Sequence, residues 1–282
     1  MPKYKQRDID YIVDYHNLSP QGKRNLETSG IHPGIPGTVL DLGIDNDYVQ
    51  HMHSIEQKYG NYFWLPLDVP KLEIDNIEEF LNFWDNESAP ALRQVPDIGE
   101  PWSKEDHPLG QKSSWYVPSF RELTLYQVPG LINNSIWSTK LYQGKHKTVD
   151  KIIDYVFEYY PVNKRNPVFQ IFIWESLQDV KLHKDHSAFW KCLTDFRTML
   201  YDENKHSTLY VVDTEKKTQA YIDLPADTNT FGWSNGRVLH GSDFHNKRKL
   251  LLIVNAVQCP EKTEMLLGKS IEKYQNQLNY SV

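Results

Sequence analysis

The chain has 282 residues, of which 39% are hydrophobic and 24% charged, and its formal net charge is −6 at neutral pH. This length suits one large domain or two small ones, with enough apolar residues for a core. No basic field of the kind that duplex nucleic acid requires is apparent. No apolar run approaches the length of a membrane span, and residues 1–7 lack the apolar core of a signal peptide. Two cysteines, Cys192 and Cys259, cannot form a disulfide framework. We therefore expect a soluble, cytoplasmic protein with neither membrane nor duplex nucleic acid as a partner.

The first half of the chain mixes predicted helices with long irregular stretches. A short helix is predicted at Ile9–His16, a strand at Val39–Leu42 and a helix at Asn46–Tyr59, ended by a glycine. Apolar residues spaced i, i+3, i+4 and i+7 predict an amphipathic helix at Asp75–Trp84, whose first residue suits the capping position. Residues 88–120 contain five prolines among many polar residues. We predict that they are irregular, as binding loops and lids often are.

The second half is predicted to be a run of short strands between two helices. The first helix is Thr148–Tyr159, with Thr148 as its N-cap, and the last is Glu261–Leu278. Strands are predicted at Val168–Trp174, Phe196–Tyr201, Thr208–Val212, Ala220–Leu224, Thr230–Trp233, the segment that carries His240, and Arg248–Val254. Many short strands at close spacing favour an antiparallel barrel or a jelly roll.

A possible metal-binding motif lies at His183-Lys184-Asp185. Side chains two apart in an extended strand point to the same side, so this strand would present an imidazole and a carboxylate to one point. A third ligand from a distant strand, His240, would complete two histidines and one carboxylate on one face of a metal. That set leaves about three octahedral positions open, the arrangement of non-haem Fe(II) oxygenases. His186 is an alternative ligand, and each residue taken singly has a purely structural explanation.

The order His183, Asp185, His240 and Arg248 resembles that of the Fe(II)- and 2-oxoglutarate-dependent dioxygenases. Members of that superfamily carry His-x-Asp, a distal histidine some tens of residues later, and a basic residue about one strand further on. Here the histidines are 57 positions apart (240 minus 183), and Arg248 follows the second by eight (248 minus 240). The resemblance covers roughly residues 168–254. It implies a mainly β protein with flanking helices (α+β) around a double-stranded β-helix, a jelly-roll and cupin-like core.

The resemblance also implies Fe(II), 2-oxoglutarate as co-substrate and molecular oxygen. The expected reaction hydroxylates an aliphatic C–H of a small molecule, such as an amino acid, or of a peptide side chain, with succinate and CO2 as co-products. A carboxylate at Asp185 favours hydroxylation, because the related halogenases carry a small residue there. The far carboxylate of 2-oxoglutarate needs a buried cation. We favour Arg248, whose planar fork accepts a carboxylate bidentately, with Lys249 as the alternative.

Three further residues are candidates for binding the substrate: Arg197, Trp190 and Trp233. Some amino-acid and aspartyl hydroxylases of the superfamily hold a substrate carboxylate with an arginine on a strand comparable to that of Arg197. No catalytic residue is expected beyond the metal ligands. Two alternatives stay open, namely a cupin-like metalloenzyme that does not use 2-oxoglutarate and a non-catalytic jelly-roll binding module.

The chain is expected to form a single domain over residues 1–282. Residues 1–165 would supply helical and loop-rich support with outer strands, residues 166–258 the β core with the metal site, and residues 260–278 the C-terminal helix. The sequence does not determine the oligomeric state or the substrate.

Overall fold

The computed structural model describes residues 46–59, 62, 64–91, 120–127, 142, 144–164, 169–176, 180–183, 195–203, 209–213, 218–233, 239–242 and 247–277. The helix predicted at Ile9–His16, the strand predicted at Val39–Leu42 and most of the segment 88–120 lie outside these residues, as do Asp185, His186 and Trp190.

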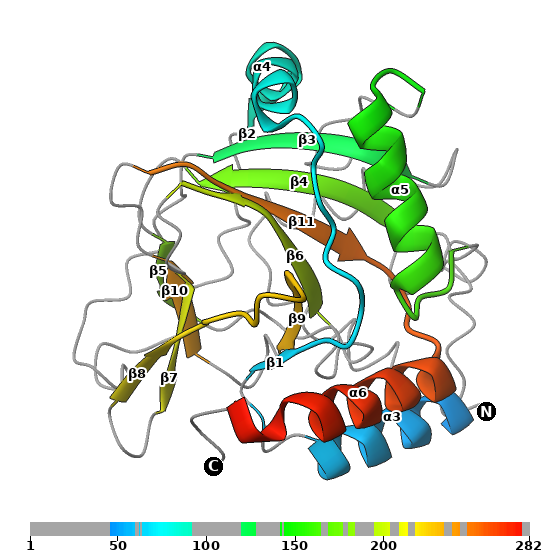
Figure 1. Cartoon of the computed structure of the whole chain (residues 1–282). Coiled ribbons are helices and arrows are strands. Elements are labelled where there is room, and N and C mark those ends of the chain that lie inside the picture. The colour runs from blue at the N-terminus through cyan, green and yellow to red at the C-terminus, as the bar shows by residue number, and fades with distance from the viewer. Residues whose placement is uncertain are drawn as a thin grey trace, which may run out of the picture.

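Two antiparallel sheets with flanking helices make up the described part of the chain, which is therefore of mixed α+β class (Figure 1). The larger sheet has the order β1-β9-β6-β11-β4-β3-β2, and the smaller has the order β5-β10-β7-β8. The strands are β1 (Trp64–Pro66), β2 (Ala89–Ala91), β3 (Phe120–Gln127), β4 (Gln170–Ser176), β5 (Val180–His183), β6 (Asp195–Asp202), β7 (Leu209–Asp213), β8 (Thr218–Tyr221), β9 (Thr230–Trp233), β10 (Leu239–Ser242) and β11 (Lys249–Asn255). From β4 to β11, successive strands alternate between the sheets except at the β7–β8 hairpin.

Four α-helices are described: α3 (Asn46–Tyr59), α4 (Ile77–Glu87), α5 (Lys147–Tyr159) and α6 (Pro260–Tyr274), the last followed by a 3-10 turn, η1 (Gln275–Gln277). Figure 1 shows α3 and α6 side by side near β1, and α5 crossing the large sheet near one end of β3. None of the helices in this part of the chain is long and apolar enough to cross a membrane.

The four predicted helices that fall within the described residues are confirmed, but both predicted N-caps are wrong. The cap of α4 is Asn76, in extended backbone, and its side-chain oxygen accepts from the Glu79 N–H at 3.1 Å. Asp75 instead pairs with Lys151 at 2.8 Å. The cap of α5 is His146, whose ring nitrogen Nδ1 accepts from the backbone N–H of the predicted cap residue. Either cap satisfies an N–H group that the first helical turn leaves without a partner.

The two faces of the large sheet differ in chemistry. Leu250, Leu252 and Val254 of β11 belong to the apolar core that the helices cover. Alternation along a strand places Lys249, Leu251 and Ile253 on the opposite face. This inner face carries buried charged groups, and the helix-covered face carries the apolar core together with the buried carboxylate of Glu175. Several buried charged side chains on one face are unusual, which makes the inner face a candidate for a ligand site.

Strand prediction missed β1, β2 and β3, of which β2 lies in the segment 88–120 predicted to be irregular, and it shifted β8. Strand β3 (Phe120–Gln127) pairs with β4 along its whole length, yet its sequence, FRELTLYQ, carries an arginine and a glutamate that lower its strand propensity. Strand β8 is Thr218–Tyr221, so the predicted Ala220–Leu224 begins two residues late and runs past its end. In both places pairing with a neighbouring strand overrides local propensity.

A buried hydroxyl network beneath α5 gives the fold an alkaline sensitivity. The Tyr155 hydroxyl donates to the Pro70 carbonyl at 2.8 Å and lies 2.8 Å from the Thr230 hydroxyl. Burial raises the pKa of Tyr155 to about 12. The folded state holds this proton more tightly than the unfolded state does. The contribution of the Tyr155 hydroxyl to the free energy of unfolding is therefore complete below pH 10 and is lost as pH rises through 12.

Tyr155→Phe is therefore expected to lower the free energy of unfolding by about 1–3 kcal/mol at neutral pH, because the Thr230 hydroxyl and the Pro70 carbonyl lose a buried partner. The variant should also lose less stability than the wild type between about pH 10 and 12. Urea denaturation of both proteins across that range measures the difference. If the free energy of unfolding fell equally with pH in both proteins, Tyr155 would not be the source of the alkaline sensitivity.

Candidate metal and co-substrate site

The two histidines of the predicted metal motif lie opposite each other in the small sheet. Strand β10 pairs with β5, and the register joins the Cα positions of His240 and His183, although the residues are 57 apart in the chain. Directly opposed residues of an antiparallel pair carry Cβ atoms about 4.5–5.5 Å apart on one face of the sheet. His240 is buried, with 5% of its surface exposed. The chain therefore brings the first and last residues of the motif together.

A contact between the sheets shows which way this face points. The Nζ atom of Lys249, at the start of β11, donates to the Ser242 hydroxyl on β10. Strand β10 pairs regularly with β7, so Ser242 and His240, two residues apart, share one face. His240 therefore faces the inner side of the large sheet. The imidazole and the buried ammonium of Lys249, which is 6% exposed, lie on facing walls of one interior.

Arg248, which we favoured from the sequence as the co-substrate residue, points the other way and is already engaged. Its Nε and Nη2 atoms donate to the Glu175 carboxylate at 2.7 and 3.3 Å. Its Nη1 and Nη2 atoms donate to the Asp85 carboxylate at 3.1 and 2.8 Å. These bonds use four of the five N–H donors of a guanidinium. This arrangement disfavours Arg248 as the ligand of a further carboxylate and leaves the alternative, Lys249, on the inner face.

Arg197 lies on the same inner face. It stands opposite Ile253 in the pairing of β6 with β11, and alternation places Ile253 on the face of Lys249. Arg197 is 7% exposed. A guanidinium buried inside the protein is suited to a carboxylate, which it can bind with two parallel hydrogen bonds. Of the other two substrate candidates, Trp233 lies in β9 opposite Asp195, and Trp190 is outside the described residues.

Glu122 is an inner-face residue that sequence reasoning missed. It stands opposite Trp174 in the pairing of β3 with β4, and the Trp174 indole N–H donates to its Oε2 atom at 3.0 Å. Glu122 is 1% exposed. The sequence carried a signal for this placement. Leu123 and Leu125 alternate with Glu122 and Thr124, which puts the Glu122 carboxylate on the face of the strand opposite its apolar face.

The donor set is of the right chemical kind for a divalent metal, since imidazole nitrogen and carboxylate oxygen are common iron ligands. Strand β5 ends at His183, two residues before Asp185. Among the side chains that the structure describes, no three of His, Cys, Asp and Glu are grouped to hold an ion. Asp185 lies outside those residues, so the three-ligand site stays a prediction.

Comparison with known proteins gives only distant likeness. No family model and no curated protein matches the chain. Among solved structures, a Pseudomonas putida prolyl-4-hydroxylase is 8% identical with a TM-score of 0.36, over 73% of this chain and 98% of that one. The dioxygenase for auxin oxidation 1 from Arabidopsis thaliana is 14% identical with a TM-score of 0.36, over 78% and 91%. An oxidoreductase of the 2OG-Fe(II) oxygenase family from Burkholderia pseudomallei is 11% identical with a TM-score of 0.34, over 73% and 93%. Likeness at these levels does not establish that this chain belongs to their family.

Proposed function

We propose that this chain is an Fe(II)- and 2-oxoglutarate-dependent oxygenase. His183, Asp185 and His240 hold the metal, and Lys249 pairs with the distal carboxylate of 2-oxoglutarate. The observation that carries this proposal is the register of His240 opposite His183, on the face from which Ser242 contacts Lys249. His240 and the buried cation thus face one interior, and His183 stands opposite His240 in the strand register. A carboxylate two residues beyond the first histidine would complete the ligand set.

The strand order supports a double-stranded β-helix. The eight strands from β4 to β11 form two four-stranded groups, with the orders β4-β11-β6-β9 and β5-β10-β7-β8. Such double-sheet jelly rolls enclose an interior between their two sheets. The two proposed histidine ligands come from β5 and the neighbouring β10 in the smaller group, and the proposed co-substrate cation comes from β11 in the larger.

The residues of the interior have separable roles in this proposal. Bound iron would supply oxygen activation in the open coordination positions left by three protein ligands. Lys249 would orient 2-oxoglutarate by its far carboxylate, and the Ser242 hydroxyl beside it can donate to the same group. Phe172 and Ile253, both buried, line the same face and exclude water. The low local dielectric strengthens the pairing of an ammonium with a carboxylate.

The proposed reaction is hydroxylation of an aliphatic C–H, with succinate and CO2 as co-products. Arg197 favours a substrate that carries a carboxylate, such as an amino acid or a peptide with an acidic group. It lies on the same face as Lys249 and is separated from it by the length of four residues along β11. That separation leaves room for the co-substrate and a second anionic molecule to be held at different points.

Thermal unfolding with Mn(II), with and without 2-oxoglutarate, tests the proposal. A ligand at 100 times its dissociation constant stabilises the folded state by about 2.7 kcal/mol, which is roughly 5–10 °C for a chain of this size. We expect a rise with Mn(II) and a further rise with 2-oxoglutarate that requires the metal. Glutarate is the control, because it has both carboxylates but lacks the 2-oxo oxygen that chelates. A response to metal alone would favour a cupin-like enzyme, and no response to either would favour a binding module.

A further inference from the structure

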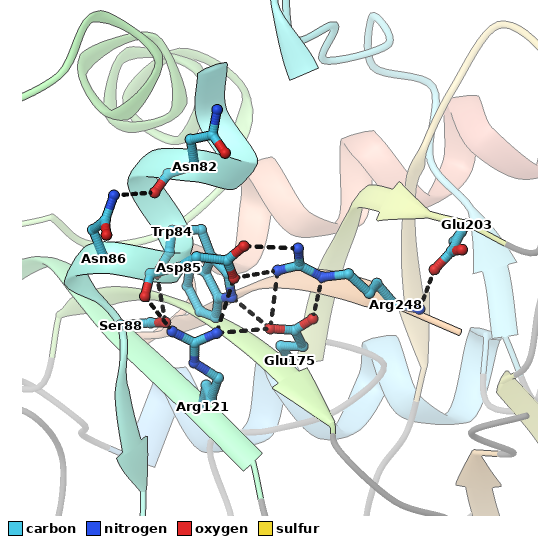
Figure 2. Close-up of polar contacts among 9 residues, drawn as sticks. All are labelled: Asn82, Trp84, Asp85, Asn86, Ser88, Arg121, Glu175, Glu203 and Arg248. Atoms are coloured by element: carbon cyan, nitrogen blue, oxygen red, sulfur yellow. Dashed lines mark hydrogen bonds and ion pairs between the residues drawn. The ribbon is translucent and has the colours of Figure 1, made fainter. Parts of the chain in front are cut away.

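Four charged side chains, from α4, β3, β4 and the residue before β11, form one cluster at the end of the large sheet (Figure 2). We call Asp85, Arg121, Glu175 and Arg248 the Arg248 cluster. Besides the bonds of Arg248, the Arg121 guanidinium donates to the Asp85 carboxylate at 2.9 Å and to the Asp85 carbonyl at 2.7 Å. The Trp84 indole N–H donates to Glu175 at 2.6 Å. Helix α4 and strands β3, β4 and β11 are thus joined at one point.

The cluster is partly desolvated, unlike an ordinary surface ion pair. The Glu175 side chain is 3% exposed and accepts from Trp84 and Arg248. Salt screens buried pairs far less than exposed ones, and removing one partner leaves a buried charge uncompensated. The guanidinium of Arg248 is therefore held in one place and on one side of the sheet.

The backbone of Arg248 is fixed as well as its side chain. Its N–H donates to the Glu203 carboxylate at 3.0 Å, and its carbonyl accepts from the Glu203 N–H at 2.9 Å. Lys249 follows directly. Adjacent residues of a strand point to opposite faces, so an Arg248 held outward sets the direction in which Lys249 leaves the sheet. A lysine stem is flexible, and its reach into the interior depends on where its Cα is held.

Within the part of the chain that the structure describes, the side-chain bonds of the cluster join α4 to the large sheet. Its members lie on α4, β3, β4 and the approach to β11, whereas His183 and His240 lie in the small sheet, where β10 is held between β5 and β7. Loosening the start of β11 should therefore disturb the co-substrate cation without disturbing the histidine pair.

We infer that the Arg248 cluster positions Lys249 and thereby sets the affinity for the co-substrate, without touching it. This inference rests on the proposed function. It assigns Arg248, Glu175 and Asp85 a positioning role, which differs from a purely structural one because it affects one of the two ligands and not the other.

The test measures two dissociation constants by calorimetry, that of Mn(II) and that of 2-oxoglutarate for the Mn(II)-loaded protein. Arg248→Met removes the bonds to both carboxylates. We expect it to raise the dissociation constant of 2-oxoglutarate roughly tenfold, the range in which supporting partners of a site act, and to leave that of Mn(II) within about twofold. Asp85→Asn is a milder variant at an exposed partner, and Arg248→Lys keeps the charge without the fork. Both should raise the dissociation constant of 2-oxoglutarate by less than Arg248→Met does. If Arg248→Met does not fold, these two milder variants carry the test.

The matched control is Lys273→Met on α6, remote from the cluster, which breaks the ion pairs of Lys273 with Asp68 and Asp227, each 2.7 Å long. It should change neither constant. Unchanged 2-oxoglutarate affinity in the cluster variants would overturn the inference, as would an equal loss of Mn(II) and 2-oxoglutarate binding, which indicates general loosening. A wild-type protein that binds Mn(II) but not 2-oxoglutarate would overturn the proposed function together with the inference.

Discussion

His240→Ala is expected to abolish Mn(II) binding at the site and to reduce succinate formation to background. With three protein ligands, no further side chain replaces one that is lost, because the open positions are needed for the co-substrate and oxygen. Partners that only orient a ligand typically cost 10–100-fold when removed, so loss of a ligand itself should cost more than about 100-fold. Titration calorimetry with Mn(II) and a succinate assay with 2-oxoglutarate measure the two effects.

Two further variants distinguish loss of the ligand from loss of folding. His240 is buried, so His240→Gln keeps most of its volume and should show the same defect with a circular dichroism spectrum like that of the wild type. His51→Ala is the matched histidine control. His51 lies on α3 and contacts Glu264 of α6 at 3.2 Å, away from the interior, so both ligands should bind as in the wild type. Full Mn(II) affinity in both His240 variants would remove this residue from the ligand set.

Lys249→Met is expected to weaken 2-oxoglutarate binding by on the order of 100-fold, or about 3 kcal/mol, because a buried carboxylate loses its charged partner. Mn(II) affinity should be retained, since both proposed histidine ligands lie in the small sheet. The ligand-free variant should be as stable as the wild type or more so. Methionine fills nearly the same volume and removes the desolvation cost of a buried ammonium. Calorimetry with Mn(II) and then 2-oxoglutarate, and urea denaturation, measure these three effects.

The neighbours of Lys249 in the chain are its controls. Lys247→Met removes an exposed charge that pairs with Glu203 at 3.2 Å, and it should leave 2-oxoglutarate binding unchanged. Arg248→Met should weaken 2-oxoglutarate binding, but less than Lys249→Met does. The reverse order would show that Arg248 is the co-substrate residue after all and that its present carboxylate partners give way to 2-oxoglutarate.

Periodicity and composition were sufficient for the elements with a strong local signal. Helix α3 begins and ends at the predicted residues, Asn46 and Tyr59, and β11 matches the most apolar predicted strand. Strand β3 was missed because Arg121 and Glu122 contradict local propensity. Its formation depends on pairing with β4, about 50 residues further along the chain.

The order His183, Asp185, His240 and then a basic residue was written in the sequence, and so was the alternation that sends Arg248 and Lys249 to opposite faces. Alternation allows either Arg248 or Lys249 to face the interior, and only the tertiary structure decided between the two. Carboxylates at Asp85 and Glu175, 163 and 73 positions away, hold Arg248 outward, and Ser242 receives Lys249 inward. Contacts between distant residues made that choice, because a strand carries no local signal of which face will be covered.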